Sequence, residues 1–211
     1  QPEVYRKSVE KNLQEGDVLD FAHGFSIRYG LIKPPSYVDV ILVAPRMIGV
    51  GVRELYVKES GAPAFVGVKQ NSSGKAKEIT LAIAKALGFT RVGVVESTFA
   101  EETELDLFSE QAIWSAIGGI FRTGFEVLVE AGYSPEVTVL EMLSSGEIAE
   151  VAKEIVKTGF FKQLPLHSKT SQYGQLSRSP RLVTHATRRK MKKIIEAVSY
   201  THLRAHETVL D

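Results

Sequence analysis

The chain has 211 residues, of which 44% are hydrophobic and 24% charged, and this composition excludes a disordered protein and predicts one or two folded domains. Basic and acidic side chains nearly balance at a formal net charge of +1, so the overall charge offers no attraction to nucleic acid or to a membrane surface. Cysteine is absent, which excludes disulfides and thiolate metal sites and fits a reducing cytoplasm, and no apolar run approaches the roughly 20 residues of a membrane span.

Short apolar runs alternate with helical stretches through the first half of the chain, which predicts an α/β arrangement with a parallel sheet. The second run is almost continuously apolar and rich in β-branched residues, as expected of a central strand covered on both faces. Between the third and fourth runs, Ser73 begins an amphipathic stretch that Gly88 ends, and this order predicts a β-α-β unit. The expected strands are Val18–Ala22, Val38–Ala44, Ala64–Val68 and Val92–Val95.

After Glu96, long helical periodicity replaces the strand pattern. The simplest division is an α/β domain over residues 1–97 followed by an all-α domain over residues 98–198, with the boundary near Thr98. The expected helices are Leu107–Glu130, Glu136–Lys157 and Pro180–Val198.

Both ends of the chain carry signals of their own. The first residue is Gln1 and not methionine, so we expect the natural start to lie further upstream. Residues 199–211 resemble translated sequencing-adapter DNA, and we expect them to be a non-native tail. His202 and His206 have the spacing of a helical metal site, but their place in this tail argues against one.

An acidic segment at the start of the helical half, Glu101–Gln111, is the first candidate site. On a helix, Asp106 and Glu110 project from the same face one turn apart, so their carboxylates could share a hard divalent cation such as Mg²⁺. Acidic residues also gather at helix N-termini because the macrodipole favours them there, and Thr103 with Asp106 resembles a capping box. Spacing alone favours this structural interpretation over a metal site.

A histidine, His23, follows the first predicted strand directly. Open α/β sheets bind ligands at the carboxyl ends of their strands, and imidazole exchanges protons near neutral pH. A single histidine beside a glycine is nevertheless more often an ordinary loop residue, so this position needs support from other residues.

These segments, taken in order along the chain, resemble the ketol-acid reductoisomerase family. The similarity rests on Phe21–Phe25, Pro34–Pro35, Val38–Pro45, Ser73–Lys77, Glu101–Gln111, Ser168 and Tyr173–Gly174. The resemblance implies a partial Rossmann-type NADPH-binding domain, followed by a helical domain that is knotted and forms the active site across a dimer interface. It also implies that the first strands and the glycine-rich turn of the cofactor domain lie before Gln1, so we expect this fragment by itself not to hold NADPH properly and to be inactive.

The resemblance further implies roles for individual residues. Asp106 would bridge two Mg²⁺ ions and Glu110 would bind one of them. His23, with its neighbours Ala22 and Gly24, would lie at the cofactor and would support proton movement. The implied reaction is an alkyl migration in a 2-acetohydroxy acid, such as 2-acetolactate or 2-aceto-2-hydroxybutanoate, followed by NADPH reduction to a 2,3-dihydroxy acid. This step belongs to valine, leucine and isoleucine biosynthesis.

Other positions that the resemblance places in the active site are less regular. Arg46 replaces a family lysine, which keeps the charge of this catalytic position but not its shape or its capacity for proton transfer. A second pair of metal-binding glutamates would begin at Glu141, which would also contact substrate, but Ser145 stands one turn later and Glu147 comes into register only through an insertion. Ser168 matches the family serine that contacts the substrate carboxylate.

Two other interpretations of the sequence stay open. One is a divergent dinucleotide-binding paralogue that is non-catalytic or has another substrate. The other is nucleic-acid binding through Arg188–Lys193, although a basic run without interleaved aromatic residues favours a solvated helix face. We expect a cytoplasmic homodimer or higher homo-oligomer without nucleic-acid or membrane partners. The choice between NADPH and NADH stays open, because the sequence lacks the discriminating loop.

Overall fold

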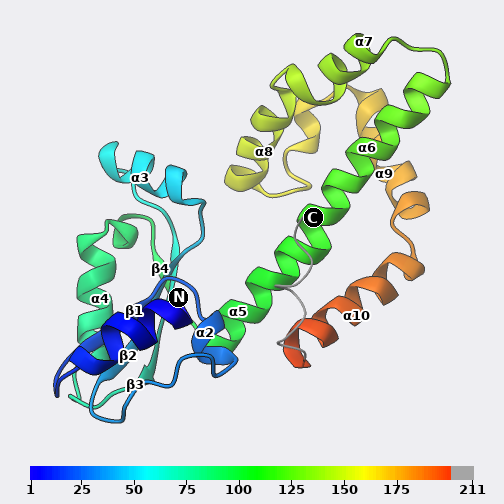
Figure 1. Cartoon of the computed structure of the whole chain (residues 1–211). Coiled ribbons are helices and arrows are strands. Elements are labelled where there is room, and N and C mark those ends of the chain that lie inside the picture. The colour runs from blue at the N-terminus through cyan, green and yellow to red at the C-terminus, as the bar shows by residue number, and fades with distance from the viewer. Residues whose placement is uncertain (201–211) are drawn as a thin grey trace. The chain divides into compact units, whose positions relative to one another are not determined.

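The computed structural model describes residues 1–200, which form two compact units, Gln1–Leu107 and Phe108–Tyr200 (Figure 1). The predicted tail histidines, His202 and His206, lie outside the described residues. Each unit has its own secondary structure: the first combines a sheet with helices, and the described part of the second is helical.

The first unit includes the beginning of the helical half of the sequence. Helix α5, Phe99–Phe108, follows the last strand, and its residues Glu102 and Thr103 are fully buried. Because this helix is buried on the first unit, the contact boundary falls after Leu107, whereas the sequence pattern changes near Thr98.

The first unit contains a four-stranded sheet in the order β1-β2-β3-β4. The strands are β1 (Val18–Phe21), β2 (Asp39–Pro45), β3 (Ala64–Gln70) and β4 (Val94–Glu96). The expected alternation of strands and helices is confirmed, with β1 parallel to β2 and β3 parallel to β4. However, β3 runs antiparallel to β2, so the sheet is mixed. The connection leaves β2 at Arg46 and returns at Pro63, whose carbonyl accepts the Arg46 N–H at 2.8 Å, and β3 therefore starts where β2 ended and runs back.

Strand β2 lies at the centre of the core, as its apolar run predicts. All its residues from Asp39 to Ala44 are buried, and successive side chains point to opposite faces of the sheet. The buried residues form one cluster of Tyr5, Phe21, Ile32, Val38, Val40, Leu42, Ala44 and Phe99, and a second of Val43, Ala62, Ala64, Val66, Ala84 and Phe89. Burial of each large aliphatic side chain contributes roughly 1.5–3 kcal/mol to folding, which makes this strand the main support of the site described below.

Helix α4, Ala76–Ala86, joins β3 to β4 and completes the predicted β-α-β unit. Gly88 follows it with φ +80°, the left-handed conformation expected of a helix stop. At the start of the helix the Ser73 hydroxyl accepts the Lys75 N–H at 3.0 Å and donates to Asp39, whereas the Ala76 N–H is accepted by Asn71 at 3.0 Å. The other helical elements of this unit are α1 (Pro2–Val4), η1 (Tyr5–Val9), η2 (Glu10–Asn12), α2 (Phe25–Arg28), α3 (Gly49–Val57) and η3 (Phe89–Arg91).

The second unit is helical, as expected, but its helices are shorter than the sequence pattern suggests. The expected helix Glu136–Lys157 is interrupted at Gly146, whose φ of +85° ends one helical segment and begins the next. Pro180 lies inside α9 and does not begin the last helix. The elements are η4 (Ser109–Trp114), α6 (Ser115–Glu130), α7 (Pro135–Val139), η5 (Leu140–Ser144), α8 (Glu147–Thr158), η6 (Leu164–Leu166), α9 (Lys169–Leu182) and α10 (His185–Tyr200).

One helical run within residues 1–200, Phe99–Glu130, is long and apolar enough to cross a membrane by length and composition alone. This corrects the expectation from the sequence that no run is apolar enough, because a mean hydropathy of 1.3 is reached although polar residues interrupt the run. One such helix is weak evidence for a membrane, since an exposed apolar helix face also serves to contact other protein surfaces.

Candidate active site at the carboxyl ends of β1 and β2

The candidate site lies where two neighbouring parallel strands end. His23 comes two residues after β1, and Arg46 directly follows β2. Because β1 and β2 are parallel, both side chains start from the same edge of the sheet, which is where open α/β sheets place their ligands. Helix α5 adds Glu102 and Asp106, which are four residues apart and project from one side of that helix.

Glu102 is the centre of this cluster. Its side chain is completely buried, and its carboxylate accepts hydrogen bonds from Gly24 N–H at 2.7 Å and Arg46 Nη1 at 3.0 Å. His23 Nδ1 lies 2.9 Å from the same carboxylate. A buried carboxylate needs such partners because desolvation of an unpaired charge is costly.

Arg46 connects the two carboxylates on α5. While Nη1 contacts Glu102, Nη2 donates to Asp106 Oδ1 at 2.5 Å. The guanidinium carbon also lies 5.0 Å from the centre of the Phe65 ring, in cation–π geometry. The planar fork of arginine can serve two acceptors at fixed spacing, which a lysine ammonium cannot do in the same way.

A glycine is required where the turn after β1 meets α5. A Cβ atom built on Gly24 would lie 2.6 Å from the carbonyl oxygen of Phe99 and 2.6 Å from Thr103 Oγ1. The backbone can therefore reach Glu102 only if position 24 has no side chain.

The electrostatics of the cluster favour a charged histidine facing a charged carboxylate. The hydrogen bond with Glu102 raises the pKa of His23 above its ordinary value, although burial acts in the opposite direction. Burial by itself would raise the pKa of Glu102, but the hydrogen bonds from His23 and Gly24 lower it overall. His23 is 33% exposed, so its ring reaches both the buried carboxylate and solvent.

The donor set is suited to a hard cation at one position. His23, Glu102 and Asp106 each offer an atom within 4.8 Å of the others, and they are the one such group of three or more potential ligands in residues 1–200. Both Glu102 oxygens already accept hydrogen bonds. Asp106 accepts from Arg46 through Oδ1, and its Oδ2 lies 3.7 Å from His23 Nδ1, so an ion at Asp106 would share this carboxylate with two cationic neighbours.

The structure brings some of the predicted residues together. His23, Arg46 and Asp106 are in contact with one another or with Glu102, and Ala22 and Gly24 belong to the same turn. Glu102 was not singled out from the sequence, although its place one helical turn before Asp106 was a signal that could have found it.

The remaining predicted residues belong to the second unit. Glu110 lies in the π-helical segment η4, directly after α5, which carries Asp106. Glu141 lies in η5 and Glu147 begins α8, with the turn at Gly146 between them. Ser168 is the N-cap of α9 and accepts from the N–H of Ser171 at 3.2 Å, a structural bond that its hydroxyl makes in addition to any substrate contact.

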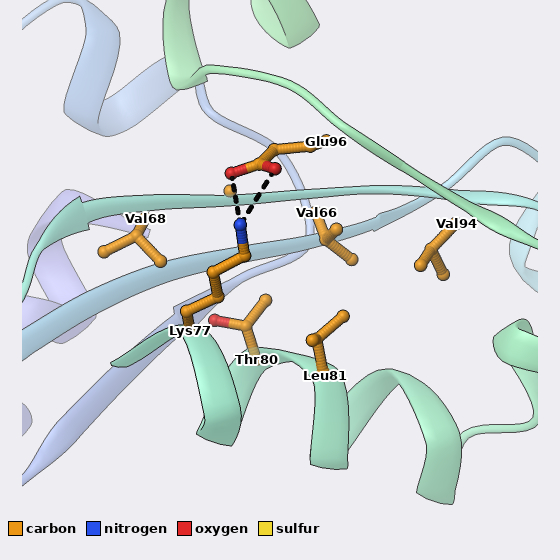
Figure 2. A pocket seen from close by; sticks show the side chains of 8 residues that line it. Val66, Val68, Lys77, Thr80, Leu81, Val94 and Glu96 are labelled. Atoms are coloured by element: carbon orange, nitrogen blue, oxygen red, sulfur yellow. Dashed lines mark hydrogen bonds and ion pairs between the residues drawn. The ribbon is translucent and has the colours of Figure 1, made fainter. Parts of the chain in front are cut away.

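A separate hollow of about 180 Å³ lies between α4 and strands β3 and β4 (Figure 2). Lys77 reaches over it and contacts both carboxylate oxygens of Glu96, at 3.1 and 3.0 Å. Its remaining lining is mostly apolar and consists of Val66, Gly67, Val68, Thr80, Leu81 and Val94. With its one ion pair internally neutralised, this hollow offers no group for acid–base or metal chemistry.

Comparison with known proteins points to one family over both halves of the chain. A family model described as the NADPH-binding domain of acetohydroxy acid isomeroreductase matches residues 1–93, and one described as the C-terminal domain of ketol-acid reductoisomerase matches residues 99–206. The curated ketol-acid reductoisomerase (NADP(+)) of Pyrobaculum arsenaticum is 46% identical over 196 residues, covering 92% of this chain and 58% of the relative. That of Methanopyrus kandleri is 45% identical over 201 residues, covering 94% and 60%.

Solved structures agree with this result. An NADH-preferring ketol-acid reductoisomerase from an uncultured archean superposes with a TM-score of 0.90 at 38% identity, over 94% of this chain and 60% of that one. A semialdehyde dehydrogenase NAD-binding protein from Cupriavidus necator superposes with a TM-score of 0.63 at 13% identity, which shows similarity of fold alone. The chain thus spans about 58–60% of the length of the reductoisomerases that it matches.

Proposed function

This chain belongs to the ketol-acid reductoisomerase family, and from this membership we propose that its protein catalyses a Mg²⁺-dependent alkyl migration coupled to NADPH reduction. The proposed substrates are 2-acetohydroxy acids, namely 2-acetolactate and 2-aceto-2-hydroxybutanoate, and the products are 2,3-dihydroxy acids of branched-chain amino-acid biosynthesis.

The observation that carries this proposal is the cluster of His23, Arg46, Glu102 and Asp106 at the carboxyl ends of β1 and β2. It combines a proton-transfer group, an oxygen ligand suited to Mg²⁺ and a fixed positive charge at the edge of the sheet where dinucleotide-binding folds place their reacting groups.

The chain's own residues have distinct tasks in this proposal. Glu102 holds His23 through Nδ1, which leaves the other ring nitrogen, Nε2, to exchange a proton with substrate. Asp106 would hold Mg²⁺, and the turn Ala22–Gly24 would lie against NADPH. When bound, Mg²⁺ polarises the substrate oxygens and NADPH supplies the hydride. Arg46 keeps a positive charge beside the developing negative charge on substrate.

Residues of the second unit complete the proposed ligand set. Glu110, Glu141 and Glu147 would contribute carboxylates to two Mg²⁺ ions, and Ser168 would contact the substrate carboxylate. The left-handed turn at Gly146 replaces the regular one-turn spacing between the second pair of glutamates, so this pair needs its own test.

The same turn favours a second candidate function, a dinucleotide-binding paralogue that has lost the reaction or has another substrate. Calorimetric titration of wild type and Asp106→Asn with Mg²⁺ distinguishes the two candidate functions. Mg²⁺ binding that disappears in Asp106→Asn supports the enzyme, whereas equal heats in both proteins support the paralogue.

The decisive assay measures the absorbance of NADPH during incubation with 2-acetolactate and Mg²⁺, using the protein from the gene restored at its front and trimmed at its tail. We expect oxidation that requires both additions, that is lost in Asp106→Asn, and that persists in Glu101→Gln, an exposed neighbour on the same helix. A folded protein that binds NADPH and Mg²⁺ and yet leaves the cofactor reduced would refute the proposed reaction.

We further propose that the protein works in the cytoplasm as a homodimer or higher homo-oligomer. Large apolar side chains of the second unit that are at least 56% exposed support a protein partner, and they include Trp114, Ile120, Val127, Val156, Phe160 and Phe161. Analytical ultracentrifugation tests this proposal, and a monomer at all concentrations would refute it.

A further inference from the structure

We propose that Arg46 is a built-in counter-cation of the site, whose guanidinium competes with a divalent cation for the Asp106 carboxylate and so sets how tightly the site holds metal. The inference rests on the proposed function, because it takes Asp106 to be a metal ligand. It adds control of metal affinity to the charge-stabilising role proposed for Arg46.

The contacts of Arg46 hold its charge on the same carboxylate that a cation would use, that of Asp106. Nη2 lies 2.5 Å from Asp106 Oδ1, and Nη1 lies 3.0 Å from Glu102 Oε1. The Phe65 ring supports the guanidinium carbon at 5.0 Å. Arg46 and Asp106 are each only 27% exposed, so solvent screens their attraction incompletely.

Glu102 acts as the anchor of this arrangement. It is fully buried and is itself held by His23 Nδ1 at 2.9 Å and by Gly24 N–H at 2.7 Å. The Arg46 bond to Glu102 can therefore persist while the bond to Asp106 opens. The guanidinium fork thus has one permanent acceptor and one that is shared with a metal ion.

The charge balance gives the direction of the effect. Arg46 offsets one of the two carboxylate charges on α5, so its removal leaves a site that is more negative by one unit. Metal binding weakens when a like charge stands within a few ångströms of the ligand oxygen. For an incompletely screened pair, we expect the loss of this charge to tighten binding on the order of 10-fold.

The test measures Mn²⁺ binding by the full chain, using the electron paramagnetic resonance signal of the free ion. We expect Arg46→Gln to lower the dissociation constant by about 10-fold, and Arg46→Lys to give an intermediate value, because lysine keeps the charge but lacks the fork. The matched control is Arg53→Gln on α3, an exposed cation in the same unit, for which screening predicts less than about a two-fold change.

A second measurement uses only the wild-type chain, so it does not depend on whether an Arg46 variant folds. A dicarbonyl reagent that modifies arginine is applied to the wild-type chain, and the modified positions are identified by mass spectrometry. Since Mg²⁺ should release one nitrogen of the fork from Asp106, we expect Mg²⁺ to accelerate modification of Arg46 and to leave Arg53 unchanged.

Several results would overturn the inference. Unchanged or weaker Mn²⁺ binding by a folded Arg46→Gln protein would show that Arg46 organises the site and does not compete with metal. Modification of Arg46 at the same rate with and without Mg²⁺ would have the same meaning. If wild type and variants all fail to bind Mn²⁺, both this inference and the metal role of Asp106 fall, whereas binding that Arg46 does not affect removes the inference alone.

Discussion

Replacing Glu102 with glutamine is the most direct test of the cluster, because this buried carboxylate accepts from His23, Gly24 and Arg46. Glutamine has the same size, but its amide nitrogen is a donor, so at least one of these donors would face another donor. Removal of one partner from a buried charge pair costs about 3–5 kcal/mol. Because His23 is 33% exposed and Arg46 keeps its ion pair with Asp106, we expect a loss of folding stability at the low end of this range, about 3 kcal/mol.

The stability lost in Glu102→Gln should depend on pH, in a direction that the pKa shifts of Glu102 and His23 determine. The pKa of Glu102 is lowered in the folded protein, so its contribution is present above its unfolded pKa of about 4.3 and is lost as pH falls through the folded pKa. The pKa of His23 is raised, so its contribution is full below its unfolded pKa of about 6.5 and is lost as pH rises through the folded pKa. The difference between wild type and Glu102→Gln should therefore be greatest between about pH 4.5 and 6.5.

Urea unfolding followed by circular dichroism, at several pH values, provides the free energies. The control is Glu101→Gln, which makes the same chemical change at an exposed position and should alter stability by less than about 0.5 kcal/mol. A loss below about 1 kcal/mol for Glu102→Gln would refute the reasoning. So would a difference that increases continuously toward alkaline pH, because it would mean that the His23 pair contributes nothing.

Three further changes test other parts of the first unit by the same unfolding measurement. Gly24→Ala should cost about 2 kcal/mol, because its Cβ would lie 2.6 Å from backbone and side-chain oxygens of α5, and a neutral result would show that the turn can move away. Burial raises the pKa of Asp39, but hydrogen bonds from Ser73 lower it overall. Asp39→Asn should therefore cost about 2 kcal/mol of stability at neutral pH and less below about pH 4. An equal loss of stability at both pH values would contradict the lowered pKa. Lys77→Ala should cost less than about 1 kcal/mol although Lys77 contacts both oxygens of Glu96, because both side chains are at least 66% exposed; a larger loss would mean that the pair closes the hollow beside α4.

Much of the first unit could be predicted from the sequence, because its signals are local. The apolar, β-branched run Val38–Ala44 predicted the buried central strand, which the structure has as Asp39–Pro45. The amphipathic stretch before Gly88 predicted α4, and the glycine provides the left-handed stop. Periodicity and backbone preference act within a few residues, so they can be read without knowledge of the fold.

The helical half shows the limit of local patterns. Apolar periodicity continues through Gly146 and predicted a single helix, but the backbone turns there with φ +85°. Glu110 lies in a π-helical segment, which no spacing rule for regular helices anticipates. Periodicity reports which side chains are apolar, and it does not report where a helix bends or ends.

Tertiary structure alone decided the composition of the site. The sequence marked His23 and Asp106 as candidates but did not single out Glu102, which lies 79 residues from His23 and yet is its closest partner in the cluster. Likewise, the bridge from Arg46 to both carboxylates depends on the strand order that sets β2 beside β1, and on a helix that returns to the same edge. Spacing along a chain reveals neighbours one or two helical turns apart, whereas contacts between distant residues follow from the burial of the whole sheet, which no short segment encodes.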